Sequence, residues 1–462
     1  MLENIVLQTD SYKAAHHCQY PPGTTKIYSY LEARKGGEYQ EVVFFGLQYL
    51  IQKHLTGQVV TAEKIARAEK FFAAHFGNDQ LFHKKGWEHI LNEHGGKLPV
   101  IIKAVREGTV VPEGNVVLTI ENTCPDCFWL TNYLETLVVK VWYPCTVATI
   151  SREMRKLIKA ALERSGDPSP ANLNFKLHDF GFRGVSSSES AAIGGAAHLV
   201  NFMGTDTLAA CELLMEYYDS EMPGFSIPAA EHSTITSWGE TGERKAYENM
   251  LEKFPTGLVA VVSDSWDVQN AVVNIWGKDL KEKVLARNGC LVIRPDSGSP
   301  EQVVPDLLES MGNVFGFVTN SKGYRVLPSQ VRLIQGDGIK RTTVGGILEA
   351  VMNRRWSVDC VAFGSGGGLL QDLNRDTQRF AMKCSHAVVN GVERDVYKRP
   401  LTDPSKNSKR GRLMLTRDPR DGFVTRREGE NSLPDELIPV FQNGELLVRQ
   451  NLADIRRRAE LT

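Results

Sequence analysis

The chain has 462 residues, of which 42% are hydrophobic and 24% are charged, and its formal net charge is −1. This composition is typical of a globular protein with two or three domains, and the balanced charge offers no general attraction to nucleic acid or anionic membranes. No apolar run is long enough to cross a bilayer, and the opening sequence MLENIVLQTDSYK lacks a signal-peptide pattern. Eight scattered cysteines fit reduced thiols, so the sequence predicts a cytoplasmic protein.

The chain contains one CxxC pair, Cys124-Pro-Asp-Cys127. Zinc sites usually need a second ligand pair, and thioredoxin-like redox pairs lie in a characteristic sequence context. We find no second pair at zinc spacing and no thioredoxin-like sequence around this one. The sequence therefore favours ordinary thiols over metal binding or redox chemistry at this position.

The N-terminal 165 residues predict a mixed α+β domain. Residues 27–31 alternate like a strand, and residues 61–76 have helical apolar spacing with a capping threonine and a closing glycine. Residues 99–123 contain two or three short strands broken by glycine turns, which predicts a compact β module. A helical stretch from residue 128 to 165 follows, and the segment GDPSPAN after it marks a domain boundary.

From about residue 173, apolar strands alternate with helices, which predicts a parallel sheet, either barrel-like or doubly wound. Five of these strands run into polar or glycine-rich loops with the sequences DFGFRG, SDSWD, RPDSG, GDG and GSGGG. Parallel α/β folds build active sites at the carboxyl ends of their strands, so five such loops in succession predict an enzyme. We assign residues 166–384 to this α/β barrel-like catalytic domain.

Several of these loops suit phosphate groups. Arg183, Arg294 and Arg375 lie at or shortly beyond strand ends, and an arginine fork matches the geometry of phosphate oxygens. The segments Gly336-Asp337-Gly338 and Ser365-Gly366-Gly367-Gly368 resemble backbone cradles for a phosphate, with the aspartate available for a ribose hydroxyl. GSGGG is not the Walker pattern, because no GK[ST] follows it.

Carboxylates follow two of the same strands. Asp264, Asp267 and Asp296 offer the oxygen ligands that Mg²⁺ prefers to share with substrate phosphates. Each of these side chains alone also fits an exposed group in an ordinary βα turn. Taken together, the arginines, glycines and carboxylates predict a sugar phosphate that carries a pyrophosphate and binds with magnesium.

Other features leave their roles open. Glu231-His232 lies in a tight segment, SIPAAEHSTI, where the histidine could be structural or catalytic. Phe180 could be an aromatic platform for a flat ring or an ordinary core residue. Past residue 385 the chain is basic, from Lys398 to Arg427, which fits a solvated loop, nucleic-acid binding or a phosphate-binding loop. The lack of interleaved aromatics disfavours nucleic acid.

The motifs TDSYK, HDFGFRGVSS, NFMGTDT, SIPAAEHSTIT, VVSDSWD, VIRPDSGSP, IQGDG and AFGSGGGLLQ resemble, in this order, the nicotinamide phosphoribosyltransferase family. The similarity extends through VYKRPLTDPSKNSKRGRL and covers nearly the whole chain. It implies an irregular α/β barrel of the type II phosphoribosyltransferases, with an additional mixed α+β domain built from the N- and C-terminal regions. It also implies a homodimer with shared active sites, so the basic residues 385–462 are expected to pack with the N-terminal domain and the dimer interface.

The resemblance implies an enzyme that joins nicotinamide to phosphoribosyl pyrophosphate, giving nicotinamide mononucleotide and pyrophosphate for NAD salvage. Phe180 and Tyr12 of the partner subunit would sandwich the nicotinamide ring, and Asp206 would accept a hydrogen bond from the carboxamide. ATP would phosphorylate His232, which couples ATP hydrolysis to tighter substrate binding. The implied catalytic residues are His232, Asp296, Arg294, Asp267 and Glu231, of which Asp267 and Asp296 would hold Mg²⁺. The other implied substrate-binding residues are Arg34, Arg183, Ser226, Ser263, Gly336, Asp337, Gly366, Gly367, Arg375, Lys383, Lys398 and Lys406.

The expected chemistry needs no general base, because the pyridine nitrogen of nicotinamide carries no proton. Displacing pyrophosphate from the anomeric carbon passes through an oxocarbenium-like transition state, which arginines and Mg²⁺ on the leaving group would stabilise. A carboxylate at Asp206 that faces the ring substituent favours the amide and repels nicotinate. The nearest alternative is a nicotinate phosphoribosyltransferase. A metal-dependent barrel lyase and a non-catalytic binding protein with this fold are more distant ones.

Overall fold

The structure, a computed structural model, describes residues 4–78, 80–402, 407–430 and 432–461, which fold into two compact units. The first unit contains the chain up to Thr149 together with Glu216–Ser220 and Leu373–Glu460. The second contains Ile150–Met215 and Glu221–Asp372. None of the helices in the described ranges is long and apolar enough to cross a membrane.

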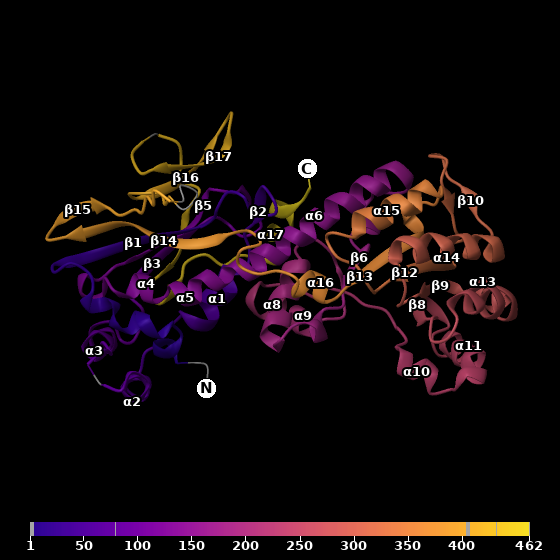
Figure 1. The fold of residues 1–462 in the computed structure, drawn as a ribbon, viewed down its shortest axis with the longest axis horizontal. Helices are drawn as coiled ribbons and strands as arrows, with labels where there is room; N and C mark the ends of the chain where they lie inside the picture. The colour runs from indigo at the N-terminus through magenta and orange to yellow at the C-terminus, as the bar shows by residue number, and fades with distance from the viewer. Residues whose placement is uncertain (1–3, 79, 403–406, 431, 462) are drawn as a thin grey trace. The chain divides into compact units, whose positions relative to one another are not determined.

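The first unit is built on a seven-stranded antiparallel sheet with the order β15-β14-β1-β5-β3-β18-β19. Figure 1 shows α1 to α5 on one face of this sheet and the β16–β17 hairpin on the other. The strands of the unit are β1 Thr24–Ala33, β2 Glu41–Val43, β3 Val100–Ala104, β4 Val110–Pro112, β5 Val116–Asn122, β14 Phe380–Val389, β15 Val392–Asp395, β16 Leu413–Asp418, β17 Gly422–Arg427, β18 Ile438–Gln442 and β19 Glu445–Leu446. The helices are η1 Ile5–Leu7, η2 Ser11–Cys18, α1 Leu47–His54, α2 Ala62–Phe76, α3 Lys84–Glu93, η3 Pro125–Cys127, α4 Leu130–Tyr133, α5 Glu135–Val138, η4 Val139–Val141 and α17 Leu452–Ala459.

Local sequence explains the helices that cover this sheet, as α2 illustrates. Thr61 caps the helix, because its Oγ1 accepts a backbone N–H of the first turn at 3.2 Å. Gly77 ends it in the left-handed conformation at φ 71°. Ile65, Ala68 and Phe72 recur at helical spacing and are buried, and each large apolar side chain stabilises the packing by about 1.5–3 kcal/mol.

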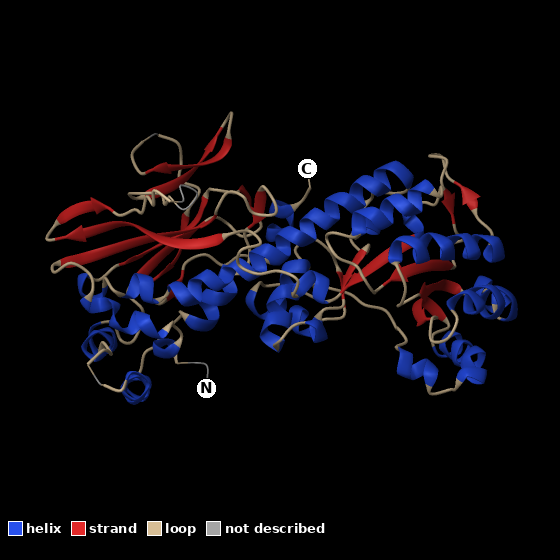
Figure 2. Ribbon diagram, in the orientation of Figure 1, coloured by secondary structure: helices blue, strands red, loops and turns tan. Residues whose placement is uncertain are grey.

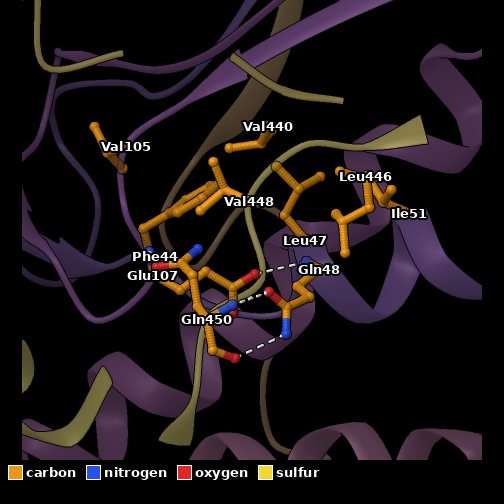
Figure 3. A pocket seen from close by; sticks show the side chains of 10 residues that line it. All are labelled: Phe44, Leu47, Gln48, Ile51, Val105, Glu107, Val440, Leu446, Val448 and Gln450. Atoms are coloured by element: carbon orange, nitrogen blue, oxygen red, sulfur yellow. Dashed lines mark hydrogen bonds between the residues drawn. The ribbon is translucent and has the colours of Figure 1, made fainter. Parts of the chain in front are cut away.

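A buried carboxylate caps the start of α1. Glu107 is 1% exposed and accepts the backbone N–H groups of Gly46 at 3.0 Å and Gln48 at 2.6 Å. The side chain of Gln48 donates to the carbonyl of Gln450 at 2.9 Å and accepts its N–H at 2.7 Å (Figure 3). Burial raises the pKa of Glu107, and these backbone donors oppose that effect. The network therefore ties the C-terminal segment of the chain to the N-terminus of α1.

The second unit contains a six-stranded parallel sheet in the order β7-β6-β13-β12-β9-β8. Figure 2 shows helices packed around these strands. The strands are β6 Leu177–Asp179, β7 Gly204–Thr205, β8 Thr256–Val262, β9 Asn288–Arg294, β12 Val331–Gln335 and β13 Val361–Ser365, with a small β10 Val318–Thr319 and β11 Arg325–Val326 hairpin. The helices are α7 Pro170–Leu173, η5 Phe182–Gly184, α8 Ser188–His198, α9 Leu208–Tyr217, α10 His232–Thr236, η6 Glu240–Gly242, α11 Glu243–Lys253, α12 Val268–Asn270, η7 Ala271–Asp279, α13 Lys281–Leu285, α14 Pro300–Phe315, α15 Val344–Asn353, η8 Val358–Cys360 and α16 Gly367–Leu370.

An irregular segment joins the two edges of the parallel sheet. Phe225 forms a parallel bridge with Gly204 of β7, and Ala229 forms one with Ala260 of β8. Backbone hydrogen bonds of 2.8–3.0 Å accompany both bridges. Residues 225–230 thus take the place of a further strand and close the sheet into an irregular barrel.

Two expectations from the sequence differ from the structure. Residues 99–123 do form three strands, but not a separate module: β3 and β5 lie inside the seven-stranded sheet, and β4 pairs with β2. The expected boundaries at 165 and 384 also differ from those of the compact units, because α6, Trp142–Ser165, continues across residue 150, and β14 pairs with β1. Pairing between distant segments leaves no local sequence pattern, which explains the strands and the boundary at 384, and the continuous helix α6 leaves no break in the sequence near residue 150.

Candidate active site

The interior of the barrel holds a cavity of about 400 Å³. Many barrels fill this space with bulky branched residues, whereas here Ala229, Ala260 and Ala362 lie on the lining and leave room. At or beyond the carboxyl ends of the strands, the lining includes Phe180, Asp206, Ser226 and Arg294. Lys176 and Asp359, which precede β6 and β13, also line the cavity, so it runs the length of the barrel.

Phe180 is held directly after β6 by its backbone and by small neighbours. Its N–H donates to the Ser365 carbonyl at 2.9 Å, and the buried Asp179 Oδ1 accepts the Gly181 N–H at 2.7 Å. A Cβ added at Gly364 would lie 2.0 Å from the Phe180 ring, so glycine is needed there. Burial raises the pKa of Asp179 to about 6. The turn presents a partly exposed ring to the cavity, where an aromatic platform for a flat ring stays a prediction.

Asp206 and Ser226 form a polar pair on the cavity lining. The Asp206 N–H donates to the carbonyl of Asp179 at 2.9 Å, which fixes the loop after β7. The Asp206 carboxylate accepts the hydroxyl of Ser226. Ser226 lies in the segment that closes the barrel, so closure itself brings the two side chains together. A carboxylate oxygen and a hydroxyl therefore share the cavity with Phe180.

His232 begins α10 and is oriented by a carboxylate. Its Nε2 lies 3.1 Å from Asp264 Oδ1. The side chain of Asp264 is only 4% exposed, and its Oδ2 accepts the Asp296 N–H at 2.9 Å and the Ser297 hydroxyl at 2.6 Å. Asp264 thus joins the loops after β8 and β9 to the histidine. The His232 side chain is 46% exposed, so the ring stays accessible while one of its nitrogens is fixed.

The other predicted catalytic residues differ in how they are engaged. Arg294 ends β9 with its Nη2 3.9 Å from Asp296 Oδ2, and its buried Nε has no hydrogen-bond partner among the described residues. Asp267 Oδ1 accepts two backbone N–H groups at the start of α12, at 2.9 and 3.0 Å. Glu231 accepts a serine hydroxyl in the first turn of α10. Ser263 is buried, and its hydroxyl is already bonded to a strand carbonyl at 3.0 Å and an indole N–H at 3.1 Å.

Glycines let the loops approach one another at this end of the barrel. A Cβ at Gly336 would lie 3.1 Å from Asp296 Oδ1, so the loop after β12 reaches the carboxylate closely. A Cβ at Gly184 would lie 2.9 Å from the Gly367 nitrogen. One at Gly366 would lie 3.4 Å from the carbonyl oxygen of Phe180. The loops after β6, β9, β12 and β13 therefore meet at one end of the barrel.

Five of the predicted substrate residues lie in the first unit: Tyr12, Arg34, Arg375, Lys383 and Lys398. Lys383 lies on β14, where burial lowers its pKa; the carboxylate of Glu135 opposes this, and the nearby cations Lys398, Arg34 and Arg375 lower the pKa further. The four cations therefore form one basic cluster. Tyr12 lies in η2 with 60% of its surface exposed. Lys406 lies outside the described residues.

The second unit brings most of the other predicted residues to the carboxyl ends of its strands. These are Phe180, Asp206, Ser226, His232, Arg294, Asp296, Gly336, Gly366 and Gly367. Arg183, Glu231, Asp267 and Asp337 lie on the exposed parts of the same loops. The sequence reasoning missed Asp179 and Gly364 as supports of Phe180. Their signal was weak, since each is one residue among several polar or small ones that flank a strand end.

Comparison with known proteins gives two family matches. Residues 4–102 match the model of the nicotinamide phosphoribosyltransferase N-terminal domain, and residues 175–445 match the nicotinate phosphoribosyltransferase (NAPRTase) family. The chain is 48% identical, over 99% of its length, to nicotinamide phosphoribosyltransferase from Xanthomonas campestris pv. campestris (strain 8004), 98% of which is covered. It is 33% identical, over 97% of its length, to nicotinamide phosphoribosyltransferase from Acinetobacter baylyi, 95% of which is covered.

Solved structures support the fold. Nicotinate-nucleotide pyrophosphorylase from Pyrococcus furiosus matches with a TM-score of 0.63 at 15% identity, covering 99% of this chain and 95% of that one. Human nicotinic acid phosphoribosyltransferase matches with a TM-score of 0.56 at 16% identity, covering 98% of this chain and 93% of that one. These matches confirm the expected irregular barrel with an additional antiparallel domain. With sequence relatives that are 48% and 33% identical along nearly its whole length, the chain belongs to the nicotinamide phosphoribosyltransferase family.

Proposed function

We propose that this protein transfers the phosphoribosyl group of phosphoribosyl pyrophosphate to the ring nitrogen of nicotinamide. The products are nicotinamide mononucleotide and pyrophosphate, and the step serves NAD salvage. The observation that carries the proposal is the cavity end lined by Phe180, Asp206 and Arg294. An aromatic face, a carboxylate and a guanidinium there match a flat ring, an amide N–H and a phosphate, respectively.

Asp206 selects the amide over the acid. Its carboxylate is an acceptor for the carboxamide N–H₂, and Ser226 keeps it oriented into the cavity. Nicotinate would bring a second carboxylate to the same place, and two like charges in a confined cavity repel each other. The same geometry therefore argues against the alternative substrate.

The chemistry then depends on position and charge. Phe180 holds the ring so that its nitrogen faces the anomeric carbon in line with the departing pyrophosphate. Arg294 neutralises phosphate charge as the C–O bond breaks, and its buried Nε, which has no partner in the part of the chain that the structure describes, is available to a ligand. The electron pair of the pyridine nitrogen forms the new C–N bond, and the pyrophosphate leaves with the electrons of the bond that breaks. No proton has to be removed.

Magnesium would be held by Asp267 and Asp296. The residues fit this ion: the Asp296 side chain is 29% exposed beside Arg294, and Asp267 caps α12 through Oδ1, so Oδ2, for which the described residues show no hydrogen bond, remains to be offered. When bound, the ion supplies positive charge to the pyrophosphate, with the substrate's own oxygens as further ligands. Asp264 is the poorer ligand, because both of its oxygens are already engaged.

ATP would act as a co-substrate through His232. Asp264 faces Nε2 at 3.1 Å, so Nδ1 is the ring nitrogen that can attack. The γ-phosphoryl group of ATP moves to Nδ1, the bond to the β-phosphate oxygen breaks, and ADP leaves. Asp264 stabilises the positive ring while this happens, as an oriented carboxylate does in a catalytic triad.

The first unit would complete the active site of a second subunit in a homodimer. Tyr12 exposes an aromatic face in η2, and the basic cluster around Lys383 matches the phosphates of ATP or phosphoribosyl pyrophosphate. Nicotinamide would thus lie between Phe180 of one chain and Tyr12 of the partner subunit.

The test is pyrophosphate release with Mg²⁺ and phosphoribosyl pyrophosphate, with nicotinamide or nicotinate in parallel, each with and without ATP. We expect turnover with nicotinamide and stimulation by ATP. Replacing Asp206 with Asn should reduce the preference for nicotinamide by a factor of about 10–100. The matched control is Asp306→Asn, on α14 outside the cavity lining. A preference for nicotinate, or an unchanged preference in Asp206→Asn, would refute the argument from Asp206.

A further inference from the structure

A second group of reactive side chains lies in the first unit, apart from the residues considered so far. His89 lies on α3 and His94 directly after it, while Cys124 precedes and Cys127 ends the turn η3 that follows β5. We call these four residues the His–Cys cluster. One ligand atom from each lies within 4.8 Å of all the others. No other group of three or more His, Cys, Asp or Glu side chains in the described residues converges in this way.

The distances in the cluster fit a tetrahedral ion. Zinc with bonds of about 2.3 Å to sulfur and about 2.0 Å to nitrogen separates its ligand atoms by roughly 3.3–3.8 Å. The Cys124 Sγ lies 3.5 Å from the His89 Nε2, inside that range. The other separations are at most 4.8 Å and would need to shorten by about 1 Å at most, which small side-chain rotations supply.

The backbone around the two cysteines is already fixed. The buried Asn122 donates its Nδ2 hydrogen to the Cys124 carbonyl at 2.8 Å, and the Cys127 N–H donates to the same carbonyl at 3.0 Å. Asn122 is itself anchored, because its Oδ1 accepts the Ile27 N–H at 2.9 Å. Both thiols are therefore presented from one rigid turn rather than from a loose loop.

His94 adds an independent indication. Its Nε2 is buried and has no hydrogen-bond partner among the described residues. A buried polar atom without a partner costs about 1–3 kcal/mol, and such atoms in native proteins usually have an explanation, a bound ion among them. Its place in the His–Cys cluster supplies that explanation.

The donor set selects the metal. Two thiolates and two imidazoles form the closed tetrahedral sphere that structural zinc prefers, whereas magnesium and calcium prefer oxygen. Both pairs also have zinc-type spacing, CPDC for the cysteines and HILNEH for the histidines. Cys124 and Cys127 have no second cysteine pair at zinc spacing in the sequence, but in the structure two histidines on another element lie beside them.

We propose that the His–Cys cluster binds one structural Zn²⁺ ion, which fastens the end of α3 to the end of β5. Four protein ligands leave no open position for a substrate, so the ion stabilises the fold rather than reacting. The ion would also hold the helix that contacts η2. His83, at the start of α3, stacks on His17 of η2 with ring centroids 4.0 Å apart, and η2 also carries Tyr12.

The test uses the full-length protein, purified with reductant and without chelators, loaded with ZnCl₂ or CoCl₂ and dialysed against metal-free buffer. We expect about one zinc per chain by mass spectrometry of the metal content. We also expect the cobalt form to show the visible bands of tetrahedral coordination and a near-ultraviolet thiolate charge-transfer band. Protein without retained metal, or cobalt without the thiolate band, would overturn the proposal.

Variants locate the ion. His89→Gln and the double variant Cys124→Ser/Cys127→Ser should weaken zinc binding at least tenfold in competition with a chromophoric chelator. The exposed controls Cys18→Ser and His75→Gln should bind as the wild type does. His89 is only partly buried, so its variant should keep a native circular dichroism spectrum and stay interpretable if the cysteine variant unfolds. Equal binding by the folded His89→Gln protein would refute the site, as would a Cys124–Cys127 disulfide that persists with reductant and zinc.

Discussion

The two units position reactive side chains in opposite ways. In the barrel, most candidate side chains lie just after a strand, and residues far apart in the sequence meet because the parallel strands all end at the same face. In the antiparallel unit, side chains converge only where distant segments pack together, as in the His–Cys cluster and around Glu107. A βα repeat therefore reveals its site in the sequence, whereas an antiparallel sheet conceals what its packing brings together.

The largest effect should follow from breaking the buried network of the first unit. Glu107→Ala leaves the Gly46 and Gln48 N–H groups at the start of α1 buried without an acceptor. We expect the free energy of unfolding to fall by about 3–4 kcal/mol, measured by urea denaturation. Glu107→Gln keeps one acceptor oxygen, so its unfolding free energy should fall by less.

The control for this change is Glu445→Ala in the same unit. Glu445 is exposed and pairs with Lys97 at 3.3 Å, so its loss should change the unfolding free energy by about 0.5 kcal/mol or less. If the two alanine variants lost equal unfolding free energy, Glu107 would contribute no more than a surface carboxylate and would not be needed to cap α1.

In the barrel, the corresponding substitution should change the activity rather than the stability of the fold. Gly364→Ala would place a Cβ 2.0 Å from the Phe180 ring, so the ring must leave its position on the cavity lining. We expect kcat/KM for nicotinamide to fall by about 100-fold, or about 2.7 kcal/mol. The matched control is Gly345→Ala in α15, where the nearest atom to an added Cβ is 3.9 Å away. Unchanged kinetics in Gly364→Ala would exclude Phe180 as the ring platform.

The turn that carries Phe180 should also make stability depend on pH. Burial raises the pKa of Asp179 from 3.8 to about 6, so the folded state holds this proton to a higher pH than the unfolded state. The contribution of Asp179 to the unfolding free energy is therefore greatest below about pH 4 and falls as the pH rises through about 6. Asn cannot titrate, so Asp179→Asn is the reference. Relative to this variant, the unfolding free energy of the wild type should fall by roughly 2–3 kcal/mol between about pH 4 and pH 7. A difference that stays flat over this range would contradict the raised pKa.

The contrast between the barrel and the antiparallel unit also explains how much of the fold and of the candidate site could be predicted from the sequence. The strand–loop repeats and the family motifs foretold the barrel and nearly all candidate residues in it, because local sequence marks each strand end. They did not foretell Gly364, since only the packed structure shows that the Phe180 ring fills the place of its side chain. They also missed His89 and His94 as partners of the CxxC pair. The helix that carries the histidines and the strand end that carries the cysteines are separated in sequence, and only the folded structure brings the four side chains together.

The smallest expected effect concerns basic groups of the antiparallel unit, which we propose bind phosphate. Lys383→Met removes the central cation of the basic cluster that includes Arg34 and Lys398. We expect the KM for phosphoribosyl pyrophosphate or ATP to rise roughly tenfold, about 1.4 kcal/mol, with the KM for nicotinamide nearly unchanged. Because burial and neighbouring cations lower the pKa of Lys383, wild-type phosphate affinity should weaken at a lower alkaline pH than an ordinary lysine would give, and the variant should lose that dependence. Lys97→Met, in the same unit but paired with Glu445, is the control. If both variants behaved alike, the cluster would be a solvated surface, and the antiparallel unit would contribute no phosphate contact through Lys383.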